Sequence, residues 1–378
     1  MKKIFITLLS LCLILSMAGC SLDSNEPSVP ADTVPETQTE TGETSPAIAQ
    51  AAMAAVAVPT VTETSTAEDG TELFKYTYQS ISLVLPDPEV ADKVIIDFLN
   101  RIDQTREDAE SVAQMAQGDY NGQEDWIPYL YHVTYSPMRI DQGVLSLFGA
   151  NVTYSGAFHP ERVCLSASYD LINGEVLTLG SIMDPNAEAS DFCTLVLNGL
   201  AEMGSENYLY KGYEDTVKQR FTGDESLDQA WYFSQTGLCF YFAPYEIAPY
   251  SSGVITVEIP YEKLDGLLHS NYFPAEQETA SGDVTIRSFE DAELSQFTQI
   301  AELIQSKEGS MYLVYTDKAV QDLRIIVSDA ASSYTVFAAY GLTPGDGVMV
   351  QADALFLESM KISYKSNDTI TTVPFTAE

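Results

Sequence analysis

The residues best suited to contact a ligand lie in one short segment that begins at Pro244. Pro244 and Pro249 restrict the backbone, which lowers the entropy that neighbouring side chains lose on binding. Tyr245 and Tyr250 offer apolar area with a polar tip, and Glu246 adds a negative charge that suits a cationic partner. The alternative interpretation is a structural corner whose tyrosines fill the core between two strands.

Three isolated histidines, His132, His159 and His269, are the next candidates for chemistry. No His-x-x-x-His pair or Cys pair accompanies them, so the sequence predicts no metal site. His159 lies in a Gly-containing turn before Pro160, and a general base there would need a cleft and a carboxylate partner. We therefore favour a structural role for this turn. Tyr154 and His159, which lie in it, are still kept as candidate ligand contacts.

The motifs of common enzymes are missing from the sequence. It has no Gly-x-Ser-x-Gly elbow and no phosphate-binding loop, and it predicts no cofactor. Cys164, Cys193 and Cys239 lie among apolar residues, which favours buried free thiols over a disulfide framework. Paired carboxylates could hydrolyse a glycan, but with 55 acidic residues many pairs can be suggested. The sequence therefore favours a protein that is not an enzyme.

The net charge of the chain limits the kinds of partner that it is suited to bind. The chain of 378 residues is 45% hydrophobic, enough for a packed core, and carries 18 basic against 55 acidic residues, a net charge of −37. Such a chain is poorly suited to nucleic acid, because binding there needs cations that displace counterions from phosphates. It is equally unsuited to anionic membrane surfaces and favours cationic partners.

The N-terminus has the pattern of an export signal. Lys2 and Lys3 precede the apolar run Ile4–Met17, which is too short to span a membrane. The following Ala18-Gly19-Cys20 resembles the lipobox of bacterial lipoproteins. The resemblance implies a signal peptide over 1–19, lipidation of Cys20 and anchoring on the extracytoplasmic face of the cell membrane. An ordinary secretory peptide with an incidental cysteine is the alternative.

The segments after the leader differ in composition. Residues 20–69 are rich in Pro, Thr, Ser, Ala and acids, which predicts a lipid-anchored, disordered, acidic tether. Residues 70–275 should form a first folded domain. A polar stretch then leads to residues 283–378, which we expect to be a small β-rich domain of unknown role.

Within residues 70–275 the pattern predicts an α+β fold, a mainly antiparallel sheet with helices on one face. A helix should begin near Val90 and continue to Gly118, and a second should cover Ser190–Met203. Asn173-Gly174 predicts a type I′ hairpin turn that leads into a strand over Glu175–Leu179. The other predicted strands are Leu73–Leu85, Tyr129–Tyr135, Val144–Tyr154, Arg162–Leu171, Trp231–Phe233, Leu238–Phe242 and Gly253–Ile259.

The C-terminal part should contain one short helix, indicated by Phe297, Ile300, Ala301 and Ile304. The predicted strands there are Met311–Tyr315, Leu323–Val327, Tyr334–Ala339, Val348–Ala352, Met360–Tyr364 and Thr369–Phe375.

Three stretches resemble one known family. They are the turn Tyr154–Pro160, the hairpin Tyr169–Leu179, and Phe240–Gly253 followed by Val257–Tyr261. They are similar to the RsiV-like extracellular domain, the ectodomain of a lysozyme-sensing anti-sigma factor and the N-terminal module of some peptidoglycan deacetylases. The chain departs from that pattern at Ala157, where the family has glycine, and at Phe158, which separates it from the histidine. RsiV-type proteins have a cytoplasmic sigma-binding segment and a spanning helix, whereas this chain shows only a lipoprotein-type leader, so we do not expect it to hold a sigma factor by itself. It also lacks a deacetylase motif.

The resemblance implies a non-catalytic cell-surface lipoprotein that binds a wall-associated or cationic protein, lysozyme-like in character. A peptidoglycan or muropeptide binder is the second hypothesis, because aromatic platforms suit sugars. An uncharacterised hydrolase of wall glycan is the third.

Overall fold

The structure is a computed structural model that describes residues 54–204, 208–222, 230–275, 279–289, 297–304, 309–328 and 333–377. The predicted signal peptide, Cys20 and most of the predicted tether lie outside these ranges. Strands and a smaller share of helices confirm the α+β class. Among the described helices, none is both long enough and apolar enough to cross a membrane.

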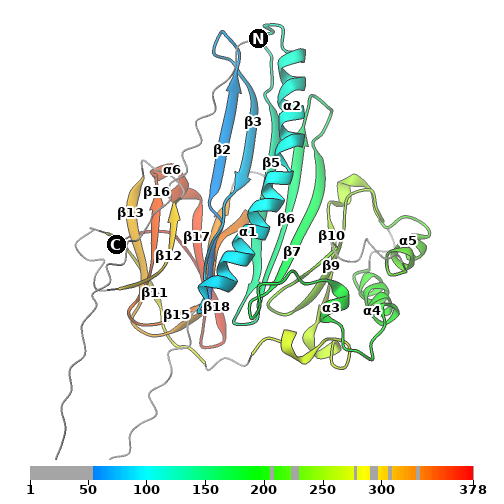
Figure 1. The fold of residues 1–378 in the computed structure, drawn as a ribbon, viewed down its shortest axis with the longest axis vertical. Helices are drawn as coiled ribbons and strands as arrows, with labels where there is room; N and C mark the ends of the chain where they lie inside the picture. Colours follow the sequence, from blue (N-terminus) through cyan, green and yellow to red (C-terminus); the bar gives the residue numbers. More distant parts are fainter. Residues whose placement is uncertain are drawn as a thin grey trace, which may run out of the picture. The chain divides into compact units, whose positions relative to one another are not determined.

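A five-stranded sheet and two helices form the first layers (Figure 1). Helices α1 (Pro88–Gln104) and α2 (Arg106–Asp119) cover one face, where Val94 and Phe98 are fully buried. Pairing is antiparallel except between β3 and β5, because the two helices connect these strands as a crossover. The strands, in spatial order, are β2 (Thr60–Thr66), β3 (Glu72–Gln79), β5 (Tyr129–Ile140), β6 (Val144–Tyr154) and β7 (Glu161–Asp170).

The predicted long helix is confirmed, with one break. Pro88 occupies the first turn, and the Asp87 carboxylate accepts a hydrogen bond from the backbone N–H of Glu89. Thr105 separates α1 from α2, and its hydroxyl donates to the Ile102 carbonyl over 2.6 Å. That bond competes with the helical pattern and marks the boundary.

A second, three-stranded sheet packs on the opposite face of the first. It consists of β10 (Ile255–Pro260), β9 (Gly237–Phe242) and β8 (Trp231–Phe233). Tyr232 and Tyr241 contact Phe148 of β6, with ring centroids 4.5 and 4.9 Å apart. The prediction of a single main sheet missed this stacking of two sheets. The prediction of helices on one face holds for each sheet separately.

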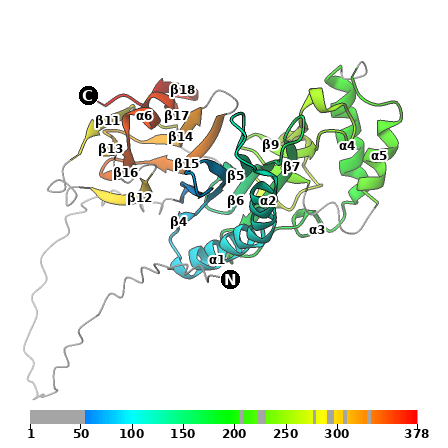
Figure 2. The same cartoon turned by 90° about the horizontal axis from the view of Figure 1, so that it is seen from above.

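Helix α4 (Ala189–Glu202) covers the outer face of the three-stranded sheet, and α5 (Tyr213–Arg220) packs beside α4 (Figure 2). Phe192 of α4 contacts Phe240 of β9, and Gly199 lies against Val257 of β10. The predicted helix over Ser190–Met203 is thus confirmed. The thiols of Cys164, Cys193 and Cys239 are free, as predicted, with Cys164 half-buried and the other two buried.

The C-terminal part is β-rich, as predicted, and builds two facing sheets around one apolar cluster. A six-stranded sheet has the order β18-β17-β14-β15-β1-β4, in which β1 is Ala55–Ala57 and β4 is Ser82–Val84. A four-stranded sheet has the order β11-β13-β16-β12. A short helix, α6 (Ala354–Ser359), was not predicted. The C-terminal strands are β11 (Val284–Ser288), β12 (Thr298–Ile304), β13 (Ser310–Thr316), β14 (Val320–Ser328), β15 (Ser333–Leu342), β16 (Asp346–Ala352), β17 (Met360–Ser366) and β18 (Thr369–Pro374).

The prediction of a tether through residue 69 is wrong for residues 54–69. Strand β1 (Ala55–Ala57) pairs with β15 on one side and with β4 (Ser82–Val84) on the other, and β2 pairs with β3. The three residues of β1 are fully buried. Their small apolar side chains, which we interpreted as part of a disordered tether, therefore pack inside a sheet. Since β1 and β4 belong to the six-stranded sheet, the predicted boundary near residues 275–283 does not separate the sheets.

Three local predictions are also wrong. Residues 297–304 form strand β12 rather than a helix, because they pair in parallel with β16. The strand predicted over Leu73–Leu85 is divided into β3 and β4. After β7, only Gly174 of the Asn173-Gly174 pair has positive φ, at 78°, and Val176 forms a single bridge to Tyr169. The chain then enters α3 (Leu179–Ile182), which Thr178 and Ser181 cap reciprocally.

Candidate functional site

The structure brings His159 together with two of the predicted tyrosines. The imidazole stacks on the Tyr250 ring with centroids 4.2 Å apart, and His159 Nε2 lies 3.5 Å from the Tyr245 hydroxyl. The Tyr250 hydroxyl donates to the Pro160 carbonyl over 3.0 Å. These contacts join the β6–β7 turn to the β9–β10 connection, and thus link the two stacked sheets.

Two aromatic rings of this region face solvent. Phe158 is completely exposed at 103% of its reference area, and Tyr245 is 57% exposed. Phe158 lies edge-on to His159 with centroids 6.4 Å apart, and Tyr245 lies 5.5 Å from Tyr250. We call Phe158, His159, Tyr245 and Tyr250 the aromatic surface cluster. Its outer rings offer apolar area that the fold itself does not bury.

The β9–β10 connection explains how Tyr245 is presented. Tyr245 has a φ of 71°, in the left-handed region, and its N–H donates to the Ala248 carbonyl over 3.0 Å. Ile247 and Ala248 are buried at 0% and 2% exposure, and Pro249 leads into a 3-10 turn at Tyr250–Ser252. Both predicted roles therefore coexist: the middle of the segment fills the core, and Tyr245 is turned outward.

Glu246 does not have its predicted role. Its carboxylate forms an ion pair of 2.6 Å with Arg220, and the two side chains are only 23% and 15% exposed. It also accepts a hydrogen bond from the Ala243 N–H over 2.9 Å, while the Arg220 guanidinium lies over the Phe242 ring. Glu246 is thus neutralised inside the protein, and the prediction that it meets a cationic partner is wrong. Arg220 lies in α5, which was not predicted from the sequence.

The other three predicted contacts, Tyr154, Pro244 and Pro249, are not part of the exposed aromatic group. Tyr154 packs edge-on against Tyr129 with centroids 6.0 Å apart, in the core under α1 and α2. Tyr129 in turn stacks on Trp126. Pro244 and Pro249 are half-buried and shape the backbone beside Tyr245. The structure therefore places Tyr154 in a separate aromatic group and leaves the two prolines as supports.

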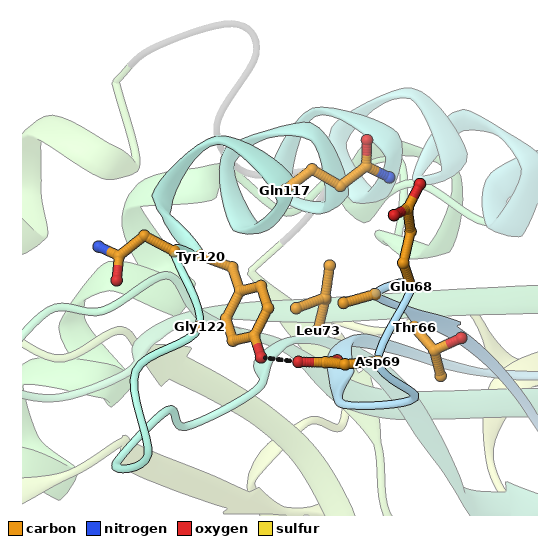
Figure 3. Close-up of a pocket in the computed structure, with 9 residues that line it drawn as sticks. Thr66, Glu68, Asp69, Leu73, Gln117, Tyr120 and Gly122 are labelled. Carbon is orange, nitrogen blue, oxygen red and sulfur yellow. Dashed lines mark hydrogen bonds between the residues drawn. The ribbon is translucent and has the colours of Figure 1, made fainter.

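An open hollow of about 490 Å³ lies between the β2–β3 turn and the end of α2 (Figure 3). The Asp69 carboxylate accepts hydrogen bonds from the Tyr120 hydroxyl over 2.6 Å and from the Thr71 N–H over 2.9 Å. These bonds, the first being the largest cause, lower the pKa of Asp69. Glu68 also lines this hollow, so it carries negative charge.

A groove of about 310 Å³ runs between α2 and strands β6 and β7. The Tyr131 hydroxyl donates to Asp108 over 3.3 Å and accepts from the Asn151 amide over 2.6 Å. Burial, and then the Asp108 charge, raise the pKa of Tyr131 to about 12. Thr153 and Glu161 complete a polar lining of hydroxyl, amide and carboxylate groups.

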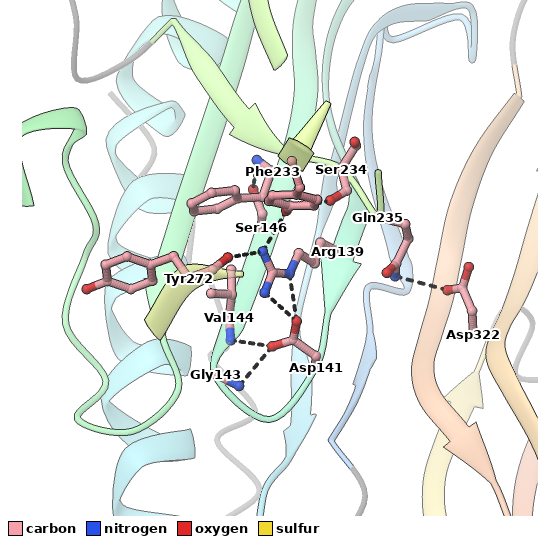
Figure 4. Close-up of polar contacts among 11 residues, drawn as sticks. Arg139, Asp141, Gly143, Val144, Ser146, Phe233, Ser234, Gln235, Tyr272 and Asp322 are labelled. Atoms are coloured by element: carbon pink, nitrogen blue, oxygen red, sulfur yellow. Dashed lines mark hydrogen bonds and ion pairs between the residues drawn. The ribbon is translucent and has the colours of Figure 1, made fainter. Parts of the chain in front are cut away.

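A buried ion pair stabilises the C-terminal end of β5, whereas Tyr131 of the groove lies near the start of that strand (Figure 4). Arg139, 1% exposed, lies 2.6 Å from Asp141, and it donates to the Tyr261 hydroxyl and the Tyr272 carbonyl over 2.6 Å each. The backbone N–H groups of Gly143 and Val144 donate to the other Asp141 oxygen. This network explains the Pro260-Tyr261 motif as structural, because it ties the end of β10 to the β5–β6 turn.

The remaining histidines, His132 and His269, are half-buried in β5 and before a 3-10 turn. Within the described ranges, no group of three or more His, Cys, Asp or Glu side chains is placed to hold a metal ion.

Comparison with known proteins connects part of the chain with an uncharacterised family. Residues 192–262 match the family described as "Protein of unknown function (DUF3298)". A solved structure of a DUF3298 member from Bacteroides fragilis has 19% identity and a TM-score of 0.41, and the match covers 57% of this chain and 94% of that chain. A DUF3298 protein from Pseudomonas aeruginosa has 18% identity and a TM-score of 0.39, with coverage of 58% and 97%. No curated protein matches the chain. The matched segment runs from Phe192 in α4 to Glu262, and it includes Tyr245 and Tyr250 of the aromatic surface cluster.

Proposed function

We propose that this protein is a non-catalytic cell-surface lipoprotein that binds a wall-associated or cationic protein, lysozyme-like in character, through the aromatic surface cluster. The observation that carries the proposal is the exposure of Phe158 and Tyr245 on a backbone held by the His159–Tyr250 stack. Rigid, exposed aromatic side chains lose little entropy when they are covered, so they are effective contact residues.

The lipobox resemblance at Cys20 supports the surface location, and the RsiV-like motifs support a protein ligand. The lipid anchor is tested by incorporation of labelled palmitate, which Cys20→Ser should abolish while Cys12→Ser leaves it intact. Equal labelling of both variants would remove the anchor from the proposal.

Charge supports a cationic ligand. The net charge of −37 attracts basic proteins at long range, and this attraction weakens as salt screens it. Glu246 is paired with Arg220, so the aromatic surface cluster contributes apolar contact rather than charge. Affinity should therefore combine a salt-sensitive association rate with an aromatic contact that salt affects little.

Lysozyme binding measured by calorimetry at about 0.02 M and about 0.5 M salt tests the proposal. We expect binding that weakens with salt, and a further loss of about tenfold or more in Phe158→Ala, as for a central aromatic contact. Ile370→Ala is the matched control, because Ile370 is an exposed apolar residue of β18 at 70% exposure. Absence of lysozyme binding at low salt would rule out a lysozyme-like ligand.

The polar groove supports a second candidate, a peptidoglycan or muropeptide binder. Asp108, Asn151 and Thr153 offer the carboxylate, amide and hydroxyl groups that pair with sugar hydroxyls. Cosedimentation with purified sacculi separates the candidates: a groove binder should lose retention in Asn151→Ala and keep it in Phe158→Ala. Asp108 and Glu161 both line the groove, so release of reducing ends from sacculi tests the third hypothesis, a glycan hydrolase.

A further inference from the structure

A smaller hollow of about 130 Å³ lies beside strand β7, at the edge of the five-stranded sheet. Arg101 of α1, Ser166 and Ser168 of β7, Thr178 before α3, and Trp231 of β8 line it, together with three apolar residues. No residue of the aromatic surface cluster lines this hollow, so a ligand bound there would be independent of the proposed function. We call it the Trp231 hollow.

Trp231 contributes a buried hydrogen-bond donor that lacks an acceptor. The side chain is 2% exposed, and its indole N–H has no partner among the described residues. The ring packs edge-on against Phe233, with centroids 5.3 Å apart, inside an apolar core cluster. A buried N–H without an acceptor is unfavourable, and an acceptor placed in the hollow would relieve this cost.

Arg101 brings a guanidinium group to the hollow, and one edge of that group is ion-paired with Asp97. Its Nε donates to Asp97 over 2.6 Å, and its side chain is 32% exposed. The same Asp97 oxygen accepts from the Tyr169 hydroxyl, which fixes the carboxylate behind the guanidinium. Within the described ranges, the hydrogen bond and the ion pair of Arg101 both use its Nε, which leaves the two terminal amino groups to donate to a ligand. An arginine with free terminal groups is well suited to a carboxylate, which can accept two parallel hydrogen bonds.

The lining specifies the ligand by charge and size. Arg101 is the single charged residue of the lining, and no carboxylate is among the described residues that form it. The Ser168 hydroxyl is already bonded to Ser146, and the Thr178 hydroxyl accepts from Ser181. The hollow of about 130 Å³ has room for a group of only a few non-hydrogen atoms, such as acetate.

We propose that the Trp231 hollow binds a small carboxylate group, with the Trp231 indole N–H and the Arg101 guanidinium as its donors. The carboxylate is either a free small acid or the end of a peptide chain. Val176, 39% exposed, and Arg101 place part of the lining at the surface, which gives such a group access from solvent.

Nuclear magnetic resonance of the full chain tests this directly, because the sequence has two tryptophans and hence two indole N–H signals. Trp126→Phe assigns them by the loss of one. Titration of the wild-type protein with sodium acetate, against sodium chloride at equal ionic strength, should move the Trp231 signal downfield along a saturable curve. A dissociation constant in the range of about 1–50 mM is what four non-hydrogen atoms can provide.

Variants and a neutral probe complete the test. Arg101→Gln should weaken acetate binding at least fivefold, whereas Arg106→Gln, a surface arginine of α2, should leave it unchanged. N-acetylglycine, a carboxylate on a peptide unit, should bind if the hollow accepts chain ends, and failure of this probe alone would restrict the ligand to free acids. A Trp231 signal that does not respond to acetate indicates water only and overturns the proposal. An equal response to acetamide would overturn the carboxylate assignment.

Discussion

The imidazole of His159 and the phenol ring of Tyr250 lie nearly parallel, with 4.2 Å between centroids and 22° between planes. They come from the β6–β7 turn and the β9–β10 connection, which belong to different sheets. The stack therefore holds two distant segments in one arrangement, and Phe158 and Tyr245 project from it into solvent. This relationship is the structural basis of the proposed binding surface.

The Tyr250 hydroxyl should contribute to stability through its bond to the Pro160 carbonyl. Tyr250→Phe keeps the ring stacked on His159 but removes one of the two polar contacts of that carbonyl, the other being His159 Nδ1 at 3.2 Å, so we expect the free energy of unfolding to fall by about 1 kcal/mol. Urea denaturation measures the change. Tyr210→Phe is the control, because Tyr210 is 41% exposed and should show a change within about 0.5 kcal/mol. Equal effects of the two variants would contradict the role of the hydroxyl.

The buried Arg139–Asp141 pair should be far more important for stability than an exposed one. Asp141→Ala leaves the Arg139 charge buried without its partner, which should cost about 3–5 kcal/mol in unfolding free energy. Asp103→Ala breaks a pair with Arg106 in which the carboxylate is 80% exposed, so it should cost less than about 1 kcal/mol. Urea unfolding of both variants provides the comparison, and similar midpoints would show that the network in Figure 4 is not a stabilising element.

The core thiols should be unreactive in the folded protein. Burial raises the pKa of Cys239 to about 12 and that of Cys164 to about 11, so both remain protonated at pH 8. Alkylation with N-ethylmaleimide, mapped by mass spectrometry, should be slow at these residues. Its rate should rise about tenfold per pH unit between pH 8 and pH 10, because so far below these pKa values the small thiolate fraction is still increasing. In urea the same thiols should react quickly and follow an ordinary cysteine pKa. Rapid labelling of Cys239 in the native protein would show that β9 opens readily.

The raised pKa of Cys239 also predicts how the free energy of unfolding changes with pH. The raised pKa of Cys239 means that the unfolded chain loses the thiol proton first as pH increases. The contribution of the Cys239 thiol to the free energy of unfolding is fully present below its pKa in the unfolded chain, which is near 9. It is lost as pH rises toward the pKa of about 12 in the folded protein. Unfolding free energy should therefore fall in this range, and Cys239→Ala should reduce the slope. An unchanged slope would assign the alkaline loss to other groups, such as the tyrosines.

Periodic strands and helices were predictable from the sequence, because burial follows their pattern. In β10 the alternating Ile255, Val257 and Ile259 are buried at 6%, 2% and 2%, and β6 begins and ends where predicted. Strand β12 shows the limit of this approach. Its apolar residues have helical spacing, but parallel pairing with β16, interrupted only by a register shift between Gln299 and Ala301, decides the conformation.

The proposed binding surface was only partly predictable from the sequence. The prolines and tyrosines of the β9–β10 connection indicated a rigid segment, and the structure adds His159 to it. The Glu246–Arg220 pair could not be read from the sequence, since no local pattern links that segment with α5. Strand β1 was missed for a similar reason: its apolar residues follow an acidic, proline-rich stretch, and its partners β15 and β4 are distant in the chain.

The most direct test of the account is to change Tyr245 without weakening the fold. Tyr245 has positive φ, a conformation that glycine adopts without strain, so Tyr245→Gly should keep the free energy of unfolding within about 1 kcal/mol of wild type. If the aromatic surface cluster binds the ligand, calorimetry at low salt should show lysozyme affinity reduced about tenfold or more, with Tyr245→Phe close to wild type. Unchanged lysozyme affinity in a stable Tyr245→Gly protein would contradict the proposed function.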